Sequence, residues 1–247
     1  MPVPLAVGQA RLRPGPSIEI SQAQFAPSER TKTGGIWCAT VQRALFDAMR
    51  LEPDLRAAVV CMDMAAAARL TSVALMTTYV TMRPAWTGVP LVRRALALAS
   101  NGSRSPQETR MRLVWVLDAL LPSPLCNVPV FSLHGGLLGY PDIFDPVSGT
   151  IGEYDGDDHK DAARHRRDVS REAAFRDHGL EYFTVVGGDL QNRSLVVNRM
   201  HSARARSRFD PPDERLWTLD PPPWWKLEPD LDTHLLLTGE APMLVRT

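Results

Sequence analysis

The chemistry in this sequence is concentrated in one acidic stretch, Pro141 to His159, which reads PDIFDPVSGTIGEYDGDDH. It contains one histidine, neither lysine nor arginine, and six acids: Asp142, Asp145, Glu153, Asp155, Asp157 and Asp158. Apolar segments typical of strands lie on both sides. Carboxylates packed this densely repel one another and lose hydration when buried, so a positive group is expected among them. The alternative is an acidic hairpin that is simply solvated.

The spacing of turn and strand residues predicts a hairpin within this stretch. We expect Leu137–Asp145 to form one strand and Thr150–Asp155 to form its partner. The residues between them, Pro146–Gly149, have turn chemistry, because proline fixes φ and glycine permits a positive φ. The register that follows pairs Asp145 with Thr150.

That register brings three carboxylates together. Asp142 lies directly opposite Glu153, with Cβ atoms about 5 Å apart, and Asp155 lies diagonally within about 8 Å. Like charges placed opposite each other destabilise a sheet, which predicts a divalent cation between them. Oxygen ligands favour Mg²⁺, Mn²⁺ or Ca²⁺ over zinc. His159, beyond the turn expected at Gly156, is placed to return as a general base.

Composition limits the classes of protein to consider. The 247 residues are 44 % hydrophobic and 23 % charged, which predicts one or two globular domains. The formal net charge is zero, so any basic surface must be local. Cys38, Cys61 and Cys126 have no metal-site spacing and are interpreted as reduced thiols of a cytoplasmic protein. Without a basic and apolar leader or an apolar run of about 18 residues, neither secretion nor membrane insertion is expected.

Residues 1–100 are predicted to form a mainly helical N-terminal region. Short strands are expected at Ser17–Ile20 and Gly35–Ala39. The predicted helices are Val41–Arg50, one from Pro53 to about Leu70, one capped by Thr71 and Ser72, and Leu91–Ala99. This region is interpreted as a platform without chemistry of its own.

Residues 101–209 are predicted to form an α/β domain with a mixed sheet flanked by helices. Its first helix has a capping-box signature, with Ser105 as the cap, Pro106 at the first position and Glu108 at the third, and is expected to run to about Leu121. Glu108 is therefore either a capping residue or part of the site. The later elements are a strand at Asn127–Leu133, the hairpin, a helix at Lys160–His178 stopped by Gly179, a strand at Glu181–Val186 and a helix capped by Asp189.

Basic residues follow the acidic stretch. The helix at Lys160–His178 places Arg164, Arg167 or Asp168, and Arg171 on one face. Five further arginines lie between residues 191 and 209 without an acid among them. An enzyme acting on a phosphodiester needs a metal at the scissile phosphate and basic groups along the flanking backbone. The alternative for these arginines is a solvated helix face.

Residues 210–247 form a C-terminal arm rich in proline and tryptophan. Three prolines precede Trp224 and Trp225, which predicts an extended segment that packs on the body or on a protein partner. Stacking of nucleic-acid bases on the tryptophans is the alternative.

The motifs in residues 101–192 resemble those of the very-short-patch-repair-like endonucleases, a branch of the PD-(D/E)xK superfamily. The matching pieces are Ser105-x-x-Glu108, Pro141-Asp142-Ile143-Phe144-Asp145, Glu153-Tyr154-Asp155-Gly156 with His159, Arg167-Asp168-x-x-Arg171, and Gly179 followed by Tyr182–Val186. Similar actinobacterial proteins often carry a winged helix like that of type IV abortive-infection (AbiEi-type) antitoxins. Residues 36–100 resemble the helical part between the two regions, so a shortened member is expected.

The resemblance implies a restriction-endonuclease-like fold and a metal-dependent DNA endonuclease or nickase. Asp142, Glu153 and Asp155 would then bind Mg²⁺, with Mn²⁺ as a substitute. Glu108 would orient a water or a second metal, and His159 would act as a base or protonate the leaving group. The expected DNA contacts are Lys160, Arg164, Arg167 and Arg171.

One departure from the family pattern keeps a second hypothesis open. Asp155 stands where the superfamily has a lysine, which leaves transition-state charge to the metal and to His159, Lys160 or Arg171. A catalytically degenerate, DNA-binding or antitoxin-like regulator that retains the nuclease fold is the alternative function. A protein-interaction module that uses the C-terminal arm is a third.

Overall fold

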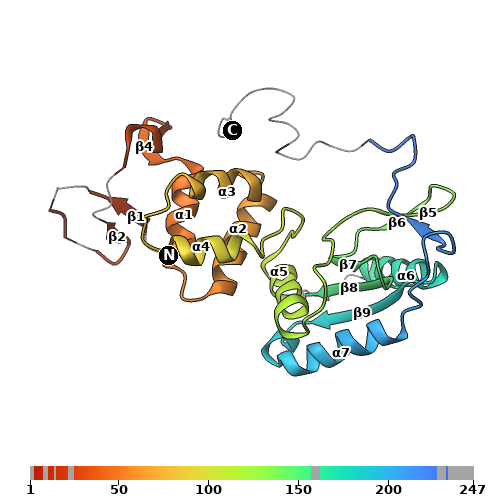
Figure 1. The fold of residues 1–247 in the computed structure, drawn as a ribbon. Coiled ribbons are helices and arrows are strands. Elements are labelled where there is room, and N and C mark those ends of the chain that lie inside the picture. The colour runs from red at the N-terminus through yellow and green to blue at the C-terminus, as the bar shows by residue number, and fades with distance from the viewer. Residues whose placement is uncertain are drawn as a thin grey trace. The chain divides into compact units, whose positions relative to one another are not determined.

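The computed structural model of the chain describes residues 3–7, 11–13, 15–21, 25–156, 162–226 and 232 (Figure 1). The described part is a mixed α/β structure with seven α-helices and several small sheets, which confirms the α/β class. It divides into two compact units, Met1–Asp47 and Ala48–Thr247. The boundaries predicted after residues 100 and 209 stay predictions.

The first unit consists mainly of two strand pairs. β1 (Val3–Ala6) pairs in parallel with β2 (Ile18–Ser21), and β3 (Arg30–Thr33) pairs antiparallel with β4 (Ile36–Ala39). The strands predicted near Ser17–Ile20 and Gly35–Ala39 are therefore present. The division between the units falls within α1 (Val41–Leu51).

Three helices open the second unit, close to their predicted places. They are α2 (Leu55–Ala67), α3 (Val73–Thr81) and α4 (Val89–Leu96). The prediction that Pro53 begins α2 was wrong, because extended Asp54 caps the helix by accepting a hydrogen bond from the Ala57 N–H. Ser72 caps α3 as predicted, with its Oγ accepting from the Leu75 N–H.

The predicted capping-box helix is α5 (Pro106–Leu113), and it is shorter than expected. A π-helical turn at Val114–Asp118 replaces the predicted continuation to Leu121. Leu120 has a left-handed backbone with φ of 54°, which ends the helical path. Trp115 Nε1 donates to the carbonyl of Pro122, so the chain turns back against the helix directly after it.

A three-stranded mixed sheet forms the centre of the second unit. β7 (Ile143–Asp145) is antiparallel to β8 (Thr150–Asp155), which is parallel to β9 (Glu181–Val186). Side chains alternate between the faces of a strand, and the two faces pack in separate cores. On one face Ile143, Phe183 and Val185 pack with residues of α5 and of α7 (Arg193–Arg206).

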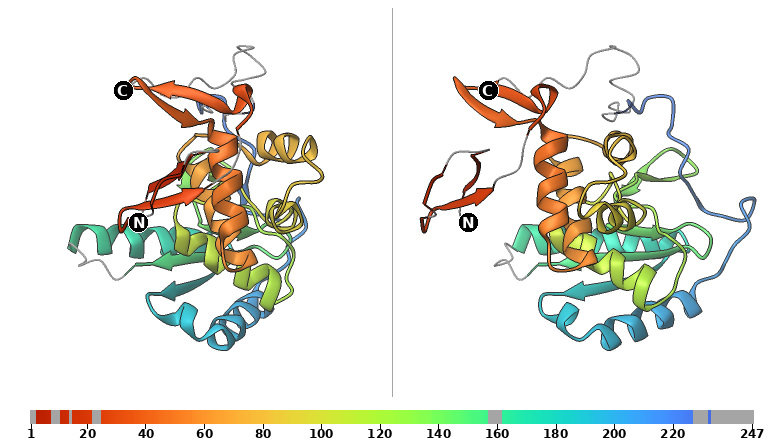
Figure 2. Two further views of the ribbon diagram at one scale, coloured as in Figure 1. Left: turned by 90° about the vertical axis from the view of Figure 1, so that its left-hand side faces the viewer. Right: turned by 60° about the vertical axis from the view of Figure 1, so that its left-hand side comes forward.

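The opposite face of the sheet packs on the other helix. Phe144, Ile151 and Tyr182 share a core with Phe175 of α6 (Ala162–Asp177). α6 and α7 therefore cover opposite faces of the sheet, as the views in Figures 1 and 2 show. Gly179, with φ of +80°, follows the end of α6 as predicted.

The strand predicted over Leu137–Asp145 was wrong, because the segment divides between two sheets. Its first part, β6 (Leu137–Gly139), pairs with β5 (Val130–Ser132) rather than with β8. A Cβ at Gly139, the last residue of β6, would lie 2.8 Å from Phe175 Cζ of α6, so glycine allows the ring to pack against this strand end. Pro141 then lacks the N–H that a continuous ladder needs.

Part of the C-terminal arm packs on this body. β10 (Trp217–Thr218) pairs antiparallel with β5, and Trp217 is buried in the same core as Phe144. Trp225 packs edge-on against Phe131 at 5.1 Å between ring centroids. Trp224 is 61 % exposed. The arm therefore packs on the chain itself through two tryptophans, and a protein partner for it stays a prediction.

Gly152 at the centre of β8 gives a test of the sheet. A Cβ at this position would lie 2.3 Å from Phe183 Cζ and 2.9 Å from Ile143 Cγ1. We expect Gly152→Ala to lower the free energy of unfolding by about 1–3 kcal/mol through overpacking. Urea denaturation followed by circular dichroism measures it. Gly156→Ala is the matched control, since its nearest neighbour would lie 4.0 Å away. Equal stability of the two variants would contradict the packing described here.

Candidate functional site

The β7–β8 turn confirms the predicted hairpin. It also shows that one of the six acids, Asp145, has a structural role. Asp145 pairs with Thr150, the predicted register. Its buried carboxylate accepts hydrogen bonds from the Val147 N–H at 3.0 Å and Ser148 Oγ at 2.6 Å, and Arg204 Nε donates to it at 3.0 Å. Asp145 therefore holds the turn and ties it to α7, and it is not available as a ligand.

Asp142 lies one residue beyond the paired part of β7, where the same register continues to Glu153. Its Oδ2 accepts a hydrogen bond from the Tyr154 N–H at 2.7 Å. Burial raises the pKa of Asp142 to about 7, and the negative charges of Glu108 and Glu153 add to the rise, whereas the Tyr154 N–H and Arg171 oppose it. The negative charges of Glu153 and Glu108 therefore both act on Asp142, while the grouping of these acids as metal ligands stays a prediction.

Glu153 is buried in the middle of this group, with 6 % of its surface exposed. Its Oε2 accepts hydrogen bonds from the Arg171 guanidinium and, at 2.9 Å, from the Tyr182 hydroxyl. Burial, together with the neighbouring Glu153 carboxylate, raises the pKa of Tyr182, which therefore stays a neutral donor. Arg171 supplies the positive charge that the dense carboxylates require.

Glu108 lies at the capped start of α5, and its part in the site stays a prediction. Ser105 Oγ accepts from the Glu108 N–H at 3.2 Å, so the cap is formed. The Glu108 carboxylate accepts from the Arg104 N–H at 2.8 Å, one residue before the position that a capping box uses. It also accepts from Asn127 Nδ2 at 2.8 Å. These bonds hold the carboxylate near Asp142, whose pKa it raises.

The remaining predicted residues are placed only in part. Asp155 ends β8 on the same face as Glu153 and is half-buried. His159 and Lys160 lie outside the described residues, as do Asp157 and Asp158. Arg164 and Arg167 lie on α6, in the part whose side chains are not described.

The fit of a metal to this site can be judged from its donors. The oxygen-only donor set suits a hard cation such as Mg²⁺, and the pKa of Asp142 is raised first by burial and then by the neighbouring carboxylates. Within the described ranges, however, no three His, Cys, Asp or Glu side chains are grouped as a metal would need. The carboxylates are thus the kind of ligand that a hard metal ion prefers. The hydrogen bond from Arg171 to Glu153, however, competes with metal binding at that carboxylate.

The arginines of α7 serve the fold more than the surface. Arg199 donates to Asp189 at 2.7 Å and to the carbonyl of Thr184 at 2.6 Å. Asp189 also accepts from the Val186 N–H, so the prediction that it caps α7 was wrong, and Asn192 is the cap. Arg204 and Arg206 pair with Asp145 and Glu181. These three guanidiniums fasten α7 to the sheet.

Two participants of the site were missed by reasoning from the sequence. Tyr182 was noted only as part of a strand, and Asn127 only as the start of one. The parallel pairing of β9 with β8 brings Tyr182 to Glu153, and the loop before β5 brings Asn127 to Glu108. The alternation in Glu181–Val186 could have placed Tyr182 on one face of the sheet, but not opposite a particular acid.

Comparisons with known proteins add no assignment. No protein-family model, curated protein or solved structure matches the chain. Within the described residues, no helix is both long enough and apolar enough to cross a membrane.

Proposed function

We propose that this chain is a metal-dependent DNA endonuclease or nickase built on a restriction-endonuclease-like sheet. The observation that carries the proposal is the buried Asp142 carboxylate, whose pKa is raised to about 7 by burial and by the negative charges of Glu108 and Glu153. Desolvated carboxylates held together against their repulsion are typical of functional sites. The mixed sheet between α6 and α7, and the resemblance of residues 101–192 to very-short-patch-repair-like endonucleases, agree with this function.

The residues of the site have separate roles in this proposal. Asp142 and Glu153, with Asp155, would hold Mg²⁺ or Mn²⁺, which supplies Lewis-acid polarisation of the phosphate when bound. Glu108, fixed by Asn127 and the Arg104 N–H, would orient the attacking water.

The basic groups act on the DNA itself. The Arg171 guanidinium can form paired hydrogen bonds to a phosphate as readily as to the Glu153 carboxylate. It would therefore bind the DNA backbone, with Lys160, Arg164 and Arg167 as further contacts. His159 would take or return the proton of the water or the leaving group.

A regulator that binds DNA without cleaving it is the second candidate. The Arg171–Glu153 ion pair favours the regulator, because a guanidinium that stands where a metal ion would bind already neutralises the Glu153 carboxylate. Asp155 in the place of the superfamily lysine favours it as well.

Metal titration combined with plasmid cleavage tests the proposal. The full chain is titrated with Mg²⁺ and Mn²⁺ by calorimetry, and the same samples are incubated with supercoiled plasmid. We expect Asp142→Asn to weaken metal binding and to reduce nicking by about 100-fold or more, because the amide is a poorer ligand than the carboxylate. Asp213→Asn, on an exposed loop, is the control.

The outcomes separate the candidates. Metal binding and nicking that are both lost in Asp142→Asn support the nuclease. DNA binding without metal binding or cleavage supports the regulator. Nicking that Asp142→Asn leaves unchanged would refute this site.

A further inference from the structure

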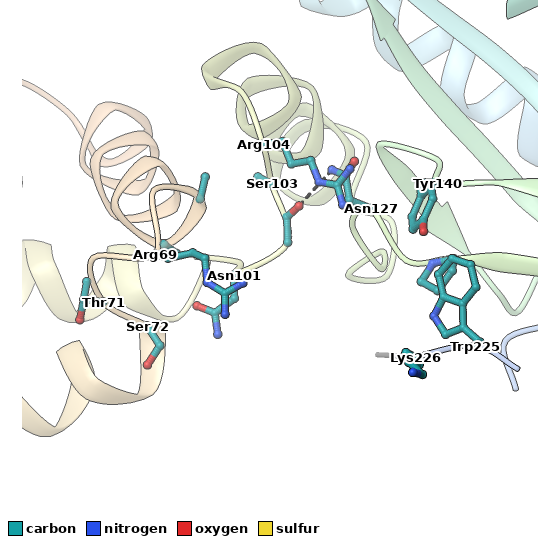
Figure 3. Close-up of a pocket in the computed structure, with 14 residues that line it drawn as sticks. Arg69, Thr71, Ser72, Asn101, Ser103, Arg104, Asn127, Tyr140, Trp225 and Lys226 are labelled. Carbon is teal, nitrogen blue, oxygen red and sulfur yellow. Dashed lines mark hydrogen bonds between the residues drawn. The ribbon is translucent and has the colours of Figure 1, made fainter. Parts of the chain in front are cut away.

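A cavity of about 540 Å³ lies apart from the carboxylates, within the second unit (Figure 3). Its walls come from the turn after α2, the segment before α5, the start of β5, the end of β6 and the C-terminal arm. The volume falls in the range of about 300–1,000 Å³ that small-molecule sites occupy. Neither Asp142 nor Glu153 lines it, although two lining residues, Arg104 and Asn127, bind the Glu108 carboxylate.

The charged side chains that line the cavity are all basic. Arg69, Arg104 and Lys226 line it, and its described lining contains no carboxylate. Two acids bond to lining residues from outside: Asp232 accepts from Ser72 Oγ at 2.6 Å, and Glu108 accepts from the Arg104 N–H and from Asn127 Nδ2, both at 2.8 Å. Figure 3 shows Arg69 on one side of the cavity and Lys226 on the other, with Arg104 between the two walls. Three cations around one opening attract an anion, and a phosphate is the anion that guanidinium groups bind best.

The aromatic side of the cavity is held in place by its neighbours. Trp225 and Tyr140 lie together, with ring centroids 6.1 Å apart. Trp225 is braced by Phe131, and the Arg104 guanidinium lies 5.4 Å from the Tyr140 ring. A planar group that enters the cavity would meet these rings at little entropic cost, because both are already positioned.

The backbone on the polar side is also fixed in an unusual conformation. Arg69 and Asn127 have φ of 56° and 51°, and both line the cavity. A left-handed backbone costs most residues other than glycine roughly 1–2 kcal/mol, and although asparagine adopts it readily, neighbouring groups hold it at both positions. At Asn127 the side chain does so, by donating to the Gly102 carbonyl and to Glu108. The polar side is thus set before any ligand arrives.

We propose that this cavity binds a nucleoside phosphate. The phosphate would lie among Arg69, Arg104 and Lys226, and the base would stack on Trp225 beside Tyr140. Two kinds of ligand carry both a base and a phosphate: a free nucleotide, and one nucleotide of a DNA single strand. Asn127, which lines the cavity, donates to Glu108, so the cavity adjoins the proposed cleavage site.

Competition binding without metal tests this inference apart from cleavage. A fluorescein-labelled thymidine oligonucleotide is titrated with the full chain in chelator, and its anisotropy is followed. Thymidine monophosphate and inorganic phosphate are then added as competitors. Because no metal is present, metal-dependent cleavage cannot occur, so the anisotropy reports binding whether or not the cleavage proposal holds.

Two variants probe the two halves of the cavity. Trp225→Ala removes a stacking surface and is expected to weaken oligonucleotide binding by about 10- to 100-fold. The double variant Arg104→Gln with Lys226→Gln changes two exposed side chains, so it should fold normally, and it should weaken binding by about 10-fold or more. Arg94→Gln, an exposed arginine on α4 outside the cavity, is the control.

Each result decides the inference. Competition by thymidine monophosphate, lost in both cavity variants, supports a free-nucleotide site. Oligonucleotide binding that both variants weaken, without competition by the mononucleotide, supports a site for a nucleotide within a strand. Inorganic phosphate that competes as well as thymidine monophosphate would refute a role for the base. If the double variant bound like Arg94→Gln, the cavity assignment would be overturned.

Discussion

Replacing Asp63 by alanine is expected to lower the free energy of unfolding of the second unit by about 3–5 kcal/mol. Asp63 lies on α2 and is fully buried. Its carboxylate accepts hydrogen bonds from Arg112 Nη2 at 2.6 Å, Thr109 Oγ1 at 2.9 Å and the Ser100 N–H at 2.8 Å. Alanine would leave the Arg112 guanidinium buried without its counter-ion, and the loss of one partner of a buried pair is far costlier than the loss of an exposed one.

Urea denaturation of the unmodified chain and the variant measures this loss. Glu172→Ala is the matched control, because Glu172 pairs with Arg176 on the exposed surface of α6. Exposed pairs of this kind contribute about 0–1 kcal/mol. A loss below about 1 kcal/mol for Asp63→Ala would mean that water reaches the network that joins α2 to α5.

The stability of the metal-free chain should fall as the pH rises from about 4 to about 7. The cause is Asp142, whose pKa is raised from its usual value near 3.8 to about 7 by burial and by Glu108 and Glu153. Between these values the folded state binds a proton that the unfolded state has released, so raising the pH favours unfolding. Above the pKa of Asp142 in the folded state, its contribution to stability is lost, and the free energy of unfolding no longer changes with pH. The expected change is on the order of a few kcal/mol.

Denaturation across this pH range, in the presence of chelator, checks the prediction. Asp142→Asn should remove most of the slope and should be more stable than the unmodified chain near pH 8, because an amide oxygen can still accept from the Tyr154 N–H. Asp213→Asn, which is exposed, should retain the slope. A slope that survives in Asp142→Asn would mean that another group causes it.

Local sequence patterns were sufficient to predict much of the sheet and half of the site. β8 and β9 have the predicted bounds, because alternating apolar residues and the turn at Pro146–Gly149 are local signals. The same register predicted that Asp142 would lie near Glu153. The break in Leu137–Asp145 was missed, since the pairing of β6 with β5 instead of β8 is a contact that a local pattern does not show.

The identity of the positive group among the acids could not be read from the sequence. The density of carboxylates required a cation, and a metal or an arginine satisfies that requirement equally well. Arg171 was assigned to DNA because a helical pattern shows which residues share a face, but not what that face meets. Its contact with Glu153 depends on how α6 packs on the sheet.

The strand order also has a consequence for folding kinetics. The β7–β8 hairpin closes a loop of only four residues, Pro146–Gly149, so it can form early at little entropic cost. β9 joins β8 only after α6 has crossed the sheet, and β10 pairs with β5 although every element from β6 to α7 lies between them in the chain. Contacts so distant along the chain form late. The carboxylates are therefore brought together before Tyr182 is there to bind them, and the barrier to folding is expected to lie at the docking of β9.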